Sequence, residues 1–368
     1  MAQHQKLVVK VGTSTLTGGT PYLNRQRMLE VTQQLARLHQ RGVNPILVTS
    51  GAKAAGAERL KFPDLGRSLP SKQMLSAVGQ SRLMHHYSEM FDIFDIVVAQ
   101  VLLTREDLSH RTRYLNARDT LTMLIEQRII PIVNENDTVA TNEIRVGDND
   151  NLSAMVAATV DADMLVILTD QPGLYTADPR TSPDAQLIHE VQRIDETIAA
   201  LAGGTGTRLG TGGMATKIEA AQIATRSGIP TVIASSTEPD VLARILKGER
   251  IGTRFVPATT PLESRKRWLL TDKPKGEIHI DAGAVRVLMN GKASLLPVGM
   301  TRVVGRFARG ETVAIRTPDG EELGHGMSNY HHNDLRQICG VKSGRINDIL
   351  GYTYGDYVIH RNNMVIMS

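Results

Sequence analysis

The first 258 residues alternate short, continuous apolar runs with segments in which apolar residues recur at helical spacing. Continuous apolar runs are typical of strands buried on both faces, as in parallel sheets covered by helices. Met28, Leu35 and Leu38 share one helix face, and Gly42 is expected to end that helix. The alternation predicts an α/β fold, an open and mostly parallel sheet sandwiched by helices. The expected strands are Lys6–Val11, Pro45–Thr49, Ile96–Leu103, Ile129–Asn134, Met164–Thr169 and Thr231–Ala234.

This rhythm ends near residue 257. The following stretch combines Pro, Thr and basic residues with the only Trp of the chain, as expected for a linker. From Gly276 onward the pattern becomes short strands separated by turns that contain Gly, which predicts a small C-terminal β-barrel. The expected domains are residues 1–258 and 276–368, joined by a linker over 259–275. Strands are expected in the barrel at residues 277–281, 294–297, 302–307, 311–316 and 322–328.

Composition narrows the class of protein. The single cysteine, Cys339, excludes an intramolecular disulfide framework and suits the reducing cytoplasm, which is the expected location. No apolar run approaches the ~20 residues of a membrane span, and the N-terminus reads as a strand rather than a signal peptide. The histidines lack zinc-ligand spacing, no metal-ligating residues are predicted, and the pairs at 85–86 and 331–332 are expected on the surface.

The net charge gives little further information about binding partners. The formal charge is +4, and residues 1–258 carry equal numbers of acidic and basic side chains, so the excess lies in residues 259–368. This mild imbalance permits an anionic partner there without requiring one.

Candidate anion-binding residues lie at the ends of the first two predicted strands. Ligands of open α/β sheets bind beyond the carboxyl ends of the strands. Lys10 and Gly12 could present an ammonium group and backbone N–H groups to one anion. Ser50 and Gly51 stand between the next strand and the next helix, where a helix N-terminus favours negative charge. Taken singly, a surface lysine and a simple helix cap explain these residues as well.

Acidic and amide side chains are concentrated at residues 133–137 and 147–151, and include Asn134, Asp137, Asn149 and Asp150. Such loops could bind an ammonium group, hold Mg²⁺ through water, or position basic side chains. A solvated polar loop is the alternative.

Two further segments suit a nucleotide. Thr169 and Asp170 begin a stretch that could form a wall of a base or ribose site, although a hairpin turn without a ligand fits equally. Gly203–Lys217 is rich in Gly and Thr, with Lys217 one turn into a helix, and could cradle phosphate. This segment does not have the spacing of a Walker loop. No strand precedes it, which excludes a dinucleotide-binding fingerprint. A flexible linker is the alternative interpretation. Together, two lysines, two anion sites and an acidic loop predict phosphoryl transfer.

The chain resembles the bacterial glutamate 5-kinases, members of the amino acid kinase family, over nearly its whole length. The C-terminal part, with GEIHIDAGA, SLLPVG, GRFARGE and ILGY, resembles a PUA domain. The motifs that carry the kinase resemblance are VVKVGTS at 8–14, VTSGA at 48–52, SKQMLSAVGQ at 71–80, LTRED at 103–107, NARDT at 116–120, VNENDTVA at 133–140, VGDNDNLSA at 146–154, LTDQPGLYTADPR at 168–180 and GTGGMATK at 210–217.

The resemblance implies ATP-dependent phosphorylation of the L-glutamate side-chain carboxylate, with Mg²⁺, as the first step of proline biosynthesis. It implies that Lys10 and Lys217 stabilise the transferring group, that Asp150 holds both lysines, and that backbone N–H groups of Gly12 and Gly51 support the phosphate. The implied glutamate-binding residues are Ser50, Asn134, Asp137 and Asn149. The implied ATP-binding residues are Lys10, Thr169, Asp170, Thr211, Gly212, Gly213, Met214, Ala215, Thr216 and Lys217.

The resemblance also implies inhibition by proline near the glutamate site and a homo-oligomer, either a dimer or a tetramer. One residue departs from the family pattern: Lys53 stands where an aliphatic residue is usual, and it could alter affinity or point to solvent. Related kinases act on aspartate, N-acetylglutamate, carbamate or UMP, which remain alternative substrates. RNA binding through the C-terminal domain is a further alternative, but the small charge excess and the lack of a clear aromatic platform favour a structural or regulatory role.

Overall fold

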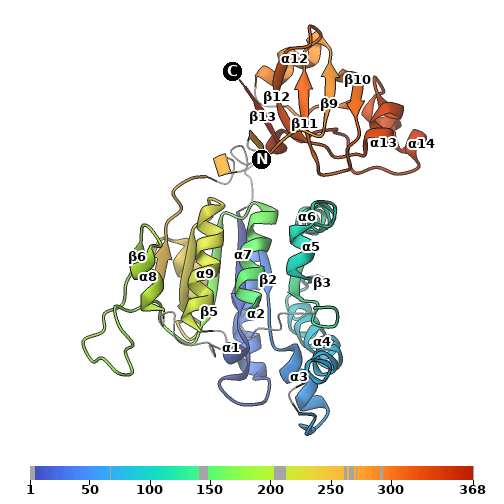
Figure 1. Ribbon diagram of the computed structural model, residues 1–368. Coiled ribbons are helices and arrows are strands. Elements are labelled where there is room, and N and C mark those ends of the chain that lie inside the picture. The colour runs from blue at the N-terminus through green and yellow to red at the C-terminus, as the bar shows by residue number, and fades with distance from the viewer. Residues whose placement is uncertain are drawn as a thin grey trace. The chain divides into compact units, whose positions relative to one another are not determined.

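The computed structural model describes residues 5–66, 68–140, 148–202, 213–260, 263–264, 269–270, 272–290 and 293–367, with Asp148 described by its backbone alone. The chain divides into two compact units (Figure 1). The first comprises residues 1–109 and 117–260, and the second residues 110–116 and 261–368. No helix in the described ranges has the length and apolar character needed to span a membrane.

The first unit is built on an eight-stranded sheet with the order β3-β4-β2-β1-β5-β7-β8-β6. Neighbouring strands are parallel except for β7 and β8, which confirms the predicted open and mostly parallel sheet. All six expected strands are present. The strands are β1 (Lys6–Val11), β2 (Asn44–Val48), β3 (Val98–Leu103), β4 (Ile130–Glu135), β5 (Met164–Thr169), β6 (Glu190–Val191), β7 (Thr231–Ser235) and β8 (Thr253–Phe255).

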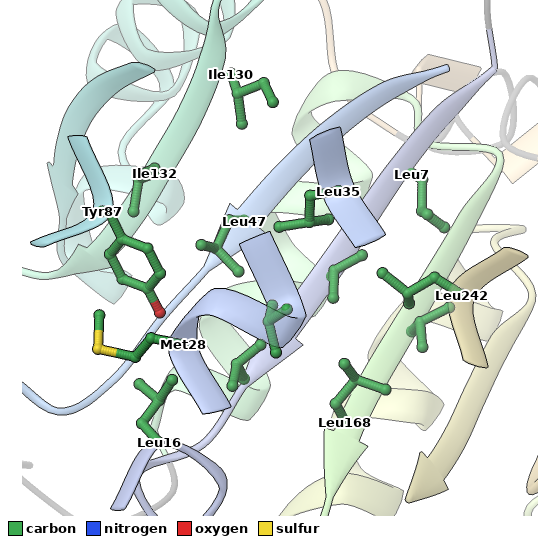
Figure 2. Close-up of a cluster of buried hydrophobic side chains, with 14 of the residues drawn as sticks. Leu7, Leu16, Met28, Leu35, Leu47, Tyr87, Ile130, Ile132, Leu168 and Leu242 are labelled. Carbon is green, nitrogen blue, oxygen red and sulfur yellow. The ribbon is translucent and has the colours of Figure 1, made fainter. Parts of the chain in front are cut away.

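Helices cover both faces of this sheet. One buried cluster joins the sheet to α1 (Thr13–Thr17), α2 (Arg25–Gln40), α3 (Ala52–Arg59), α4 (Leu69–Asp92) and α10 (Val241–Leu246). Figure 2 shows part of it, with Leu7 and Leu47 from β1 and β2 beside Leu35 of α2 and Tyr87 of α4. The other face is covered by α5 (Arg105–Ser109), α6 (Arg111–Glu126), α7 (Asp148–Val160), α8 (Glu196–Leu201) and α9 (Met214–Arg226).

Helices α3 and α4 cross at unusually short range because each has a glycine at the crossing. A Cβ atom on Gly79 would lie 1.8 Å from the backbone oxygen of Ala52, and one on Gly56 would lie 1.9 Å from that of Leu75. No side chain fits at either position. The crossing therefore sets how closely α4 approaches the end of β2, where α3 begins.

The expectation that both histidine pairs lie on the surface is wrong for one member of each. His86 is buried on the inner side of α4, and His332 is buried in the second unit with its Nδ1 2.9 Å from the carbonyl oxygen of Phe307. His85 and His86 are consecutive residues of α4, so their side chains point in different directions. His331 precedes α13 (His332–Ile338) and His332 begins it, and there too only one of the two side chains faces solvent.

The second unit contains a five-stranded sheet with the order β10-β9-β11-β12-β13, which confirms a small second β-structure. The strand expected at residues 294–297 is wrong, since Leu295 makes only one bridge, to Ile359, and a 3-10 turn follows at Pro297–Gly299. The elements are β9 (Gly276–Ile280), α12 (Ala282–Met289), β10 (Met300–Gly305), β11 (Thr312–Arg316), β12 (Glu322–Met327), α13 (His332–Ile338), α14 (Ile346–Leu350) and β13 (Met364–Ile366). Among the described residues of this unit, the helices α12, α13 and α14 were not predicted.

Residues 110–116 belong to the second unit, although they precede the rest of it by more than a hundred residues. Leu115 is buried in a cluster with Leu269, Met327 and Val365. Two arginines add polar contacts within the same unit. Arg111 Nη2 lies 2.7 Å from Asp272 Oδ2, and Arg309 Nη1 donates to Asn116 Oδ1 at 2.6 Å.

Candidate active site

Two buried lysines share one buried carboxylate at the carboxyl end of β1. Alternate residues of a strand point to opposite faces, so Lys10 shares with Val8 the face that α7 and α9 cover. Lys10 Nζ lies 2.5 Å from Asp150 Oδ1, and Lys217 Nζ lies 3.3 Å from Asp150 Oδ2. The exposed fractions of Lys10, Asp150 and Lys217 are 4%, 0% and 7%. The cluster holds two ammonium groups against one carboxylate and so carries a net positive charge.

The ionisation of this cluster follows from burial and mutual attraction. Burial opposes ionisation of Asp150, but the charges of Lys10 and Lys217 outweigh it and hold the pKa of Asp150 below its usual value. Burial, together with the charge of Lys217, lowers the pKa of Lys10 despite the attraction of Asp150. Thr216 reinforces the carboxylate by donating its hydroxyl to Asp150 Oδ2 at 2.7 Å. A buried pair of ammonium groups held this way is suited to a polyanion.

Glycines precede two of the helices that begin at the carboxyl edge of the sheet. Gly12 precedes α1, and a Cβ atom there would lie 3.1 Å from Lys10 Nζ. Gly51 precedes α3 with a φ of +99°, a backbone conformation that favours glycine. Gly12 and Gly51 therefore lie, as expected, where a strand is followed by a helix.

Amide side chains connect β4, α7 and the end of β2. Asn149 Nδ2 lies within donor distance of three acceptors, at 2.7 Å from the carbonyl oxygen of Thr49, 2.9 Å from Ser50 Oγ and 2.9 Å from Asn134 Oδ1. The Oδ1 atom of Asn149 is buried and has no hydrogen-bond partner among the described residues. An unpaired buried acceptor can take a hydrogen bond from a water molecule or from a donor on a ligand.

A cavity of about 280 Å³ lies between α4 and the ends of β3 and β4. Asp137 and Ser76 line it, together with Ala52 at the start of α3. Burial raises the pKa of Asp137, while a hydrogen bond with Ser76 and the charge of Lys53 partly offset this effect. The Lys53 side chain is exposed. Lys53 therefore points to solvent and still lowers the pKa of Asp137.

The predicted nucleotide-binding residues are described in part. Thr169 is buried at the end of β5, and its hydroxyl donates to Asp170 Oδ1 at 3.0 Å. Gly213 precedes α9, which begins with Met214, Ala215 and Thr216. Thr211 and Gly212 lie outside the described residues.

The structure brings most predicted residues together and adds others. Lys10, Asp150 and Lys217 form one cluster, and Ser50, Asn134 and Asn149 form a hydrogen-bonded group beside it. Sequence reasoning missed Ser76, Gln80 and Gln100, which line the cavity. Gln80 lies inside the motif SKQMLSAVGQ, within helix α4, where the sequence carries no sign that it lines a cavity.

No set of three or more His, Cys, Asp or Glu side chains in the described ranges is arranged to hold a metal ion. Mg²⁺ in phosphoryl-transfer enzymes is held largely by substrate phosphates and water, with one or two carboxylates, so it needs no such set. Both oxygens of Asp150 face the lysines.

The chain is similar to known proteins over its whole length. Residues 5–235 match the amino acid kinase family, and residues 276–350 match the PUA domain. The chain is 51% identical over 366 residues to the glutamate 5-kinase of Sodalis glossinidius, covering 100% of both chains. It is 52% identical over 362 residues to that of Serratia marcescens, covering 98% of this chain and 99% of the other. Among solved structures, it is similar to a UMP kinase from Bacillus anthracis, with a TM-score of 0.48 and 14% identity over 70% of this chain and 97% of the other.

Proposed function

Because the chain belongs to the glutamate 5-kinases of the amino acid kinase family, we propose that Lys10, Asp150 and Lys217 form the catalytic cluster that transfers phosphate from ATP to L-glutamate. The enzyme phosphorylates the side-chain carboxylate of glutamate to L-glutamyl 5-phosphate, the first step of proline biosynthesis. The single observation that supports this role for the cluster is the pairing of two buried ammonium groups on one buried carboxylate.

The chemistry needs charge neutralisation more than it needs a nucleophile. A carboxylate oxygen of glutamate forms the new bond to the γ-phosphorus of ATP, and the bond from that phosphorus to the β,γ-bridging oxygen breaks to release ADP. Negative charge is spread over the transferring group and the leaving oxygen in the transition state. The ammonium groups of Lys10 and Lys217 stabilise that charge. Asp150 keeps these two groups close together in a buried site from which water is excluded.

Glutamate is bound beside this cluster. Asp137 provides a carboxylate for the substrate ammonium group, and Asn149 and Ser50 provide polar atoms near the end of β2. Asn134 supports Asn149 by accepting its hydrogen bond. These assignments draw on the cavity that Asp137 lines and on the unpaired Oδ1 atom of Asn149.

ATP is the phosphate donor, as the membership of the kinase family implies. We assign its contacts to Thr169, Asp170 and residues 211–217, with backbone N–H groups of Gly12 and Gly51 supporting phosphate. Mg²⁺ would be held mainly by the phosphates and would neutralise part of their charge. We further propose that proline inhibits near the glutamate site, that the enzyme is a homo-oligomer, and that it acts in the cytoplasm.

The test of function is ADP release with Mg²⁺-ATP and each of five acceptors: glutamate, aspartate, N-acetylglutamate, carbamate and UMP. We expect turnover with glutamate alone, suppressed by proline. Turnover with another acceptor in preference to glutamate would overturn the assigned substrate. Turnover unaffected by proline would overturn the regulatory proposal alone.

Removal of the Asp137 carboxylate tests its assignment to the substrate ammonium group. Asp137→Ala is expected to raise the glutamate KM by roughly tenfold or more, because a buried charge-assisted hydrogen bond is worth ~1.5–3 kcal/mol. The ATP KM should change less than about twofold. An unchanged glutamate KM would count against the assignment.

The raised pKa of Asp137 predicts a pH dependence of glutamate binding. Asp137 attracts an ammonium group only when ionised, so affinity should fall as the pH drops through its raised pKa. Lys53 lowers that pKa, so Lys53→Gln should move the acid limb of kcat/KM for glutamate to higher pH. The profile is measured between about pH 4 and pH 8, with Lys61→Gln as an exposed lysine control. Superimposable profiles of Lys53→Gln and wild type would refute the effect.

A further inference from the structure

Four side-chain amides form a continuous hydrogen-bonded chain from the cavity to the end of β2. Asn149 Nδ2 donates to Asn134 Oδ1 at 2.9 Å, and Asn134 Nδ2 donates to Gln80 Oε1 at 2.7 Å. Gln80 Nε2 in turn donates to Gln100 Oε1 at 2.9 Å. The members come from α7, β4, α4 and β3, so the chain ties together four separate elements.

Two backbone groups determine which way these amides face. The backbone N–H of Glu135 can only donate, and it donates to Asn134 at 2.9 Å, so the atom it meets must be Oδ1. The carbonyl oxygen of Thr49 can only accept, so the atom of Asn149 that meets it at 2.7 Å must be Nδ2. Asn134 therefore turns its Nδ2 toward Gln80, and Gln80 must answer with an acceptor.

The same constraint leaves the Oδ1 atom of Asn149 as the unpaired acceptor. We infer that Gln80 is a positioning residue for glutamate binding: it holds Asn134, and through it Asn149, in the orientation that keeps Asn149 Oδ1 available to a donor on the substrate. This inference rests on the proposed function and extends it to a residue without an assigned role. Without an acceptor at position 80, the buried Nδ2 of Asn134 loses its partner, and rotation of the amide becomes less costly.

Helix α4 supports Asn149 from a second direction. The hydroxyl of Tyr87 lies 2.9 Å from Thr49 Oγ1, and Thr49 supplies the carbonyl oxygen to which Asn149 donates. Gln80 and Tyr87 are seven residues apart, which places them on the same face of the helix, two turns from each other. Helix α4 therefore contacts both Thr49 and Asn134, two of the residues that accept a hydrogen bond from Asn149.

The test compares Gln80→Met with the wild-type enzyme. Methionine has a similar length and cannot replace the hydrogen bond. We expect the glutamate KM to rise about tenfold, with kcat and the ATP KM changed less than about threefold. The matched control is Gln34→Met, because Gln34 is also half-buried and accepts a backbone N–H, from Leu242, but lies outside the chain of amides. The control should keep the wild-type glutamate KM.

A double-mutant cycle with Asn149→Ala separates positioning from direct contact with glutamate. If Gln80 acts through Asn149, Gln80→Met should raise the glutamate KM less than about twofold in the Asn149→Ala background. A tenfold rise in that background would overturn the inference, as would an unchanged KM in the single variant. If Gln80→Met does not fold, Gln100→Met makes the same comparison, because Gln100 is the next residue in the chain of amides. Its glutamate KM should rise by a smaller factor, and that rise must also be absent in the Asn149→Ala background.

Failure of this inference is distinguishable from failure of the proposed function. Wild-type enzyme that releases ADP with glutamate supports the function whatever the variants do. Wild-type enzyme that ignores glutamate overturns both the function and the inference, which depends on it.

Discussion

Lys217→Met should lower kcat about 10³-fold while the glutamate KM changes less than about threefold. Removal of one preorganised charged donor from a buried site costs about 10²–10³ in kcat, and Lys217 is a full charge on a buried carboxylate. The effect should fall on kcat because the charge that Lys217 meets develops during phosphoryl transfer. Methionine keeps the length and apolar stem of the lysine, so α9 should stay in place.

The measurement is steady-state ADP release with glutamate and ATP each varied. Lys247→Met is the control, since Lys247 is an exposed lysine at the end of α10 and should have wild-type kinetics. A variant with a wild-type kcat and a raised glutamate KM would show that Lys217 binds substrate instead of stabilising the transition state.

Gly79→Ala should destabilise the enzyme by about 3 kcal/mol and raise the glutamate KM as well. The added Cβ atom would lie 1.8 Å from a backbone oxygen of α3, so the two helices must separate. Overpacking of this kind costs about 1–3 kcal/mol, and backbone cannot yield as a flexible side chain can. The adjacent Gln80 would move with the helix, which is why substrate binding should suffer too.

Urea unfolding measures the loss, read as a lower midpoint at unchanged slope. Gly344→Ala is the matched control, because a Cβ atom there meets no atom within 4 Å and the backbone is not left-handed. Equal midpoints for Gly79→Ala and wild type would mean that the helices do not cross as closely as described.

The sheet and its central strands could be predicted from sequence because buried parallel strands leave an unbroken apolar run. The short strands β6 and β8 could not, since two or three residues carry no periodic signal. In the second unit, α12 follows directly from β9, and the helical pattern AGAVRVLM is too short to distinguish from a strand by pattern alone.

The candidate site divides in the same way. Lys10 lies near the end of a strand, and Gly12, Ser50 and Gly51 come just after one. These residues were recognisable because strand ends converge in an α/β sheet. Gln80 was not, because it lies in the middle of α4, and its partners come from residues far away in the chain. Apolar residues at helical spacing predict which face of a helix is buried. A hydrogen bond between a helix side chain and another element produces no such periodic pattern in the sequence.

The grouping of residues 110–116 with the C-terminal unit has a consequence for evolution. A unit encoded by one uninterrupted stretch can be gained or lost by a single recombination event. Here an exchange of residues 261–368 alone would leave behind Leu115 and Asn116, whose partners Met327 and Arg309 lie in the exchanged part. Inheritance of the two parts is therefore linked, and chimaeras between relatives should succeed most often when the short segment travels with the C-terminal sequence.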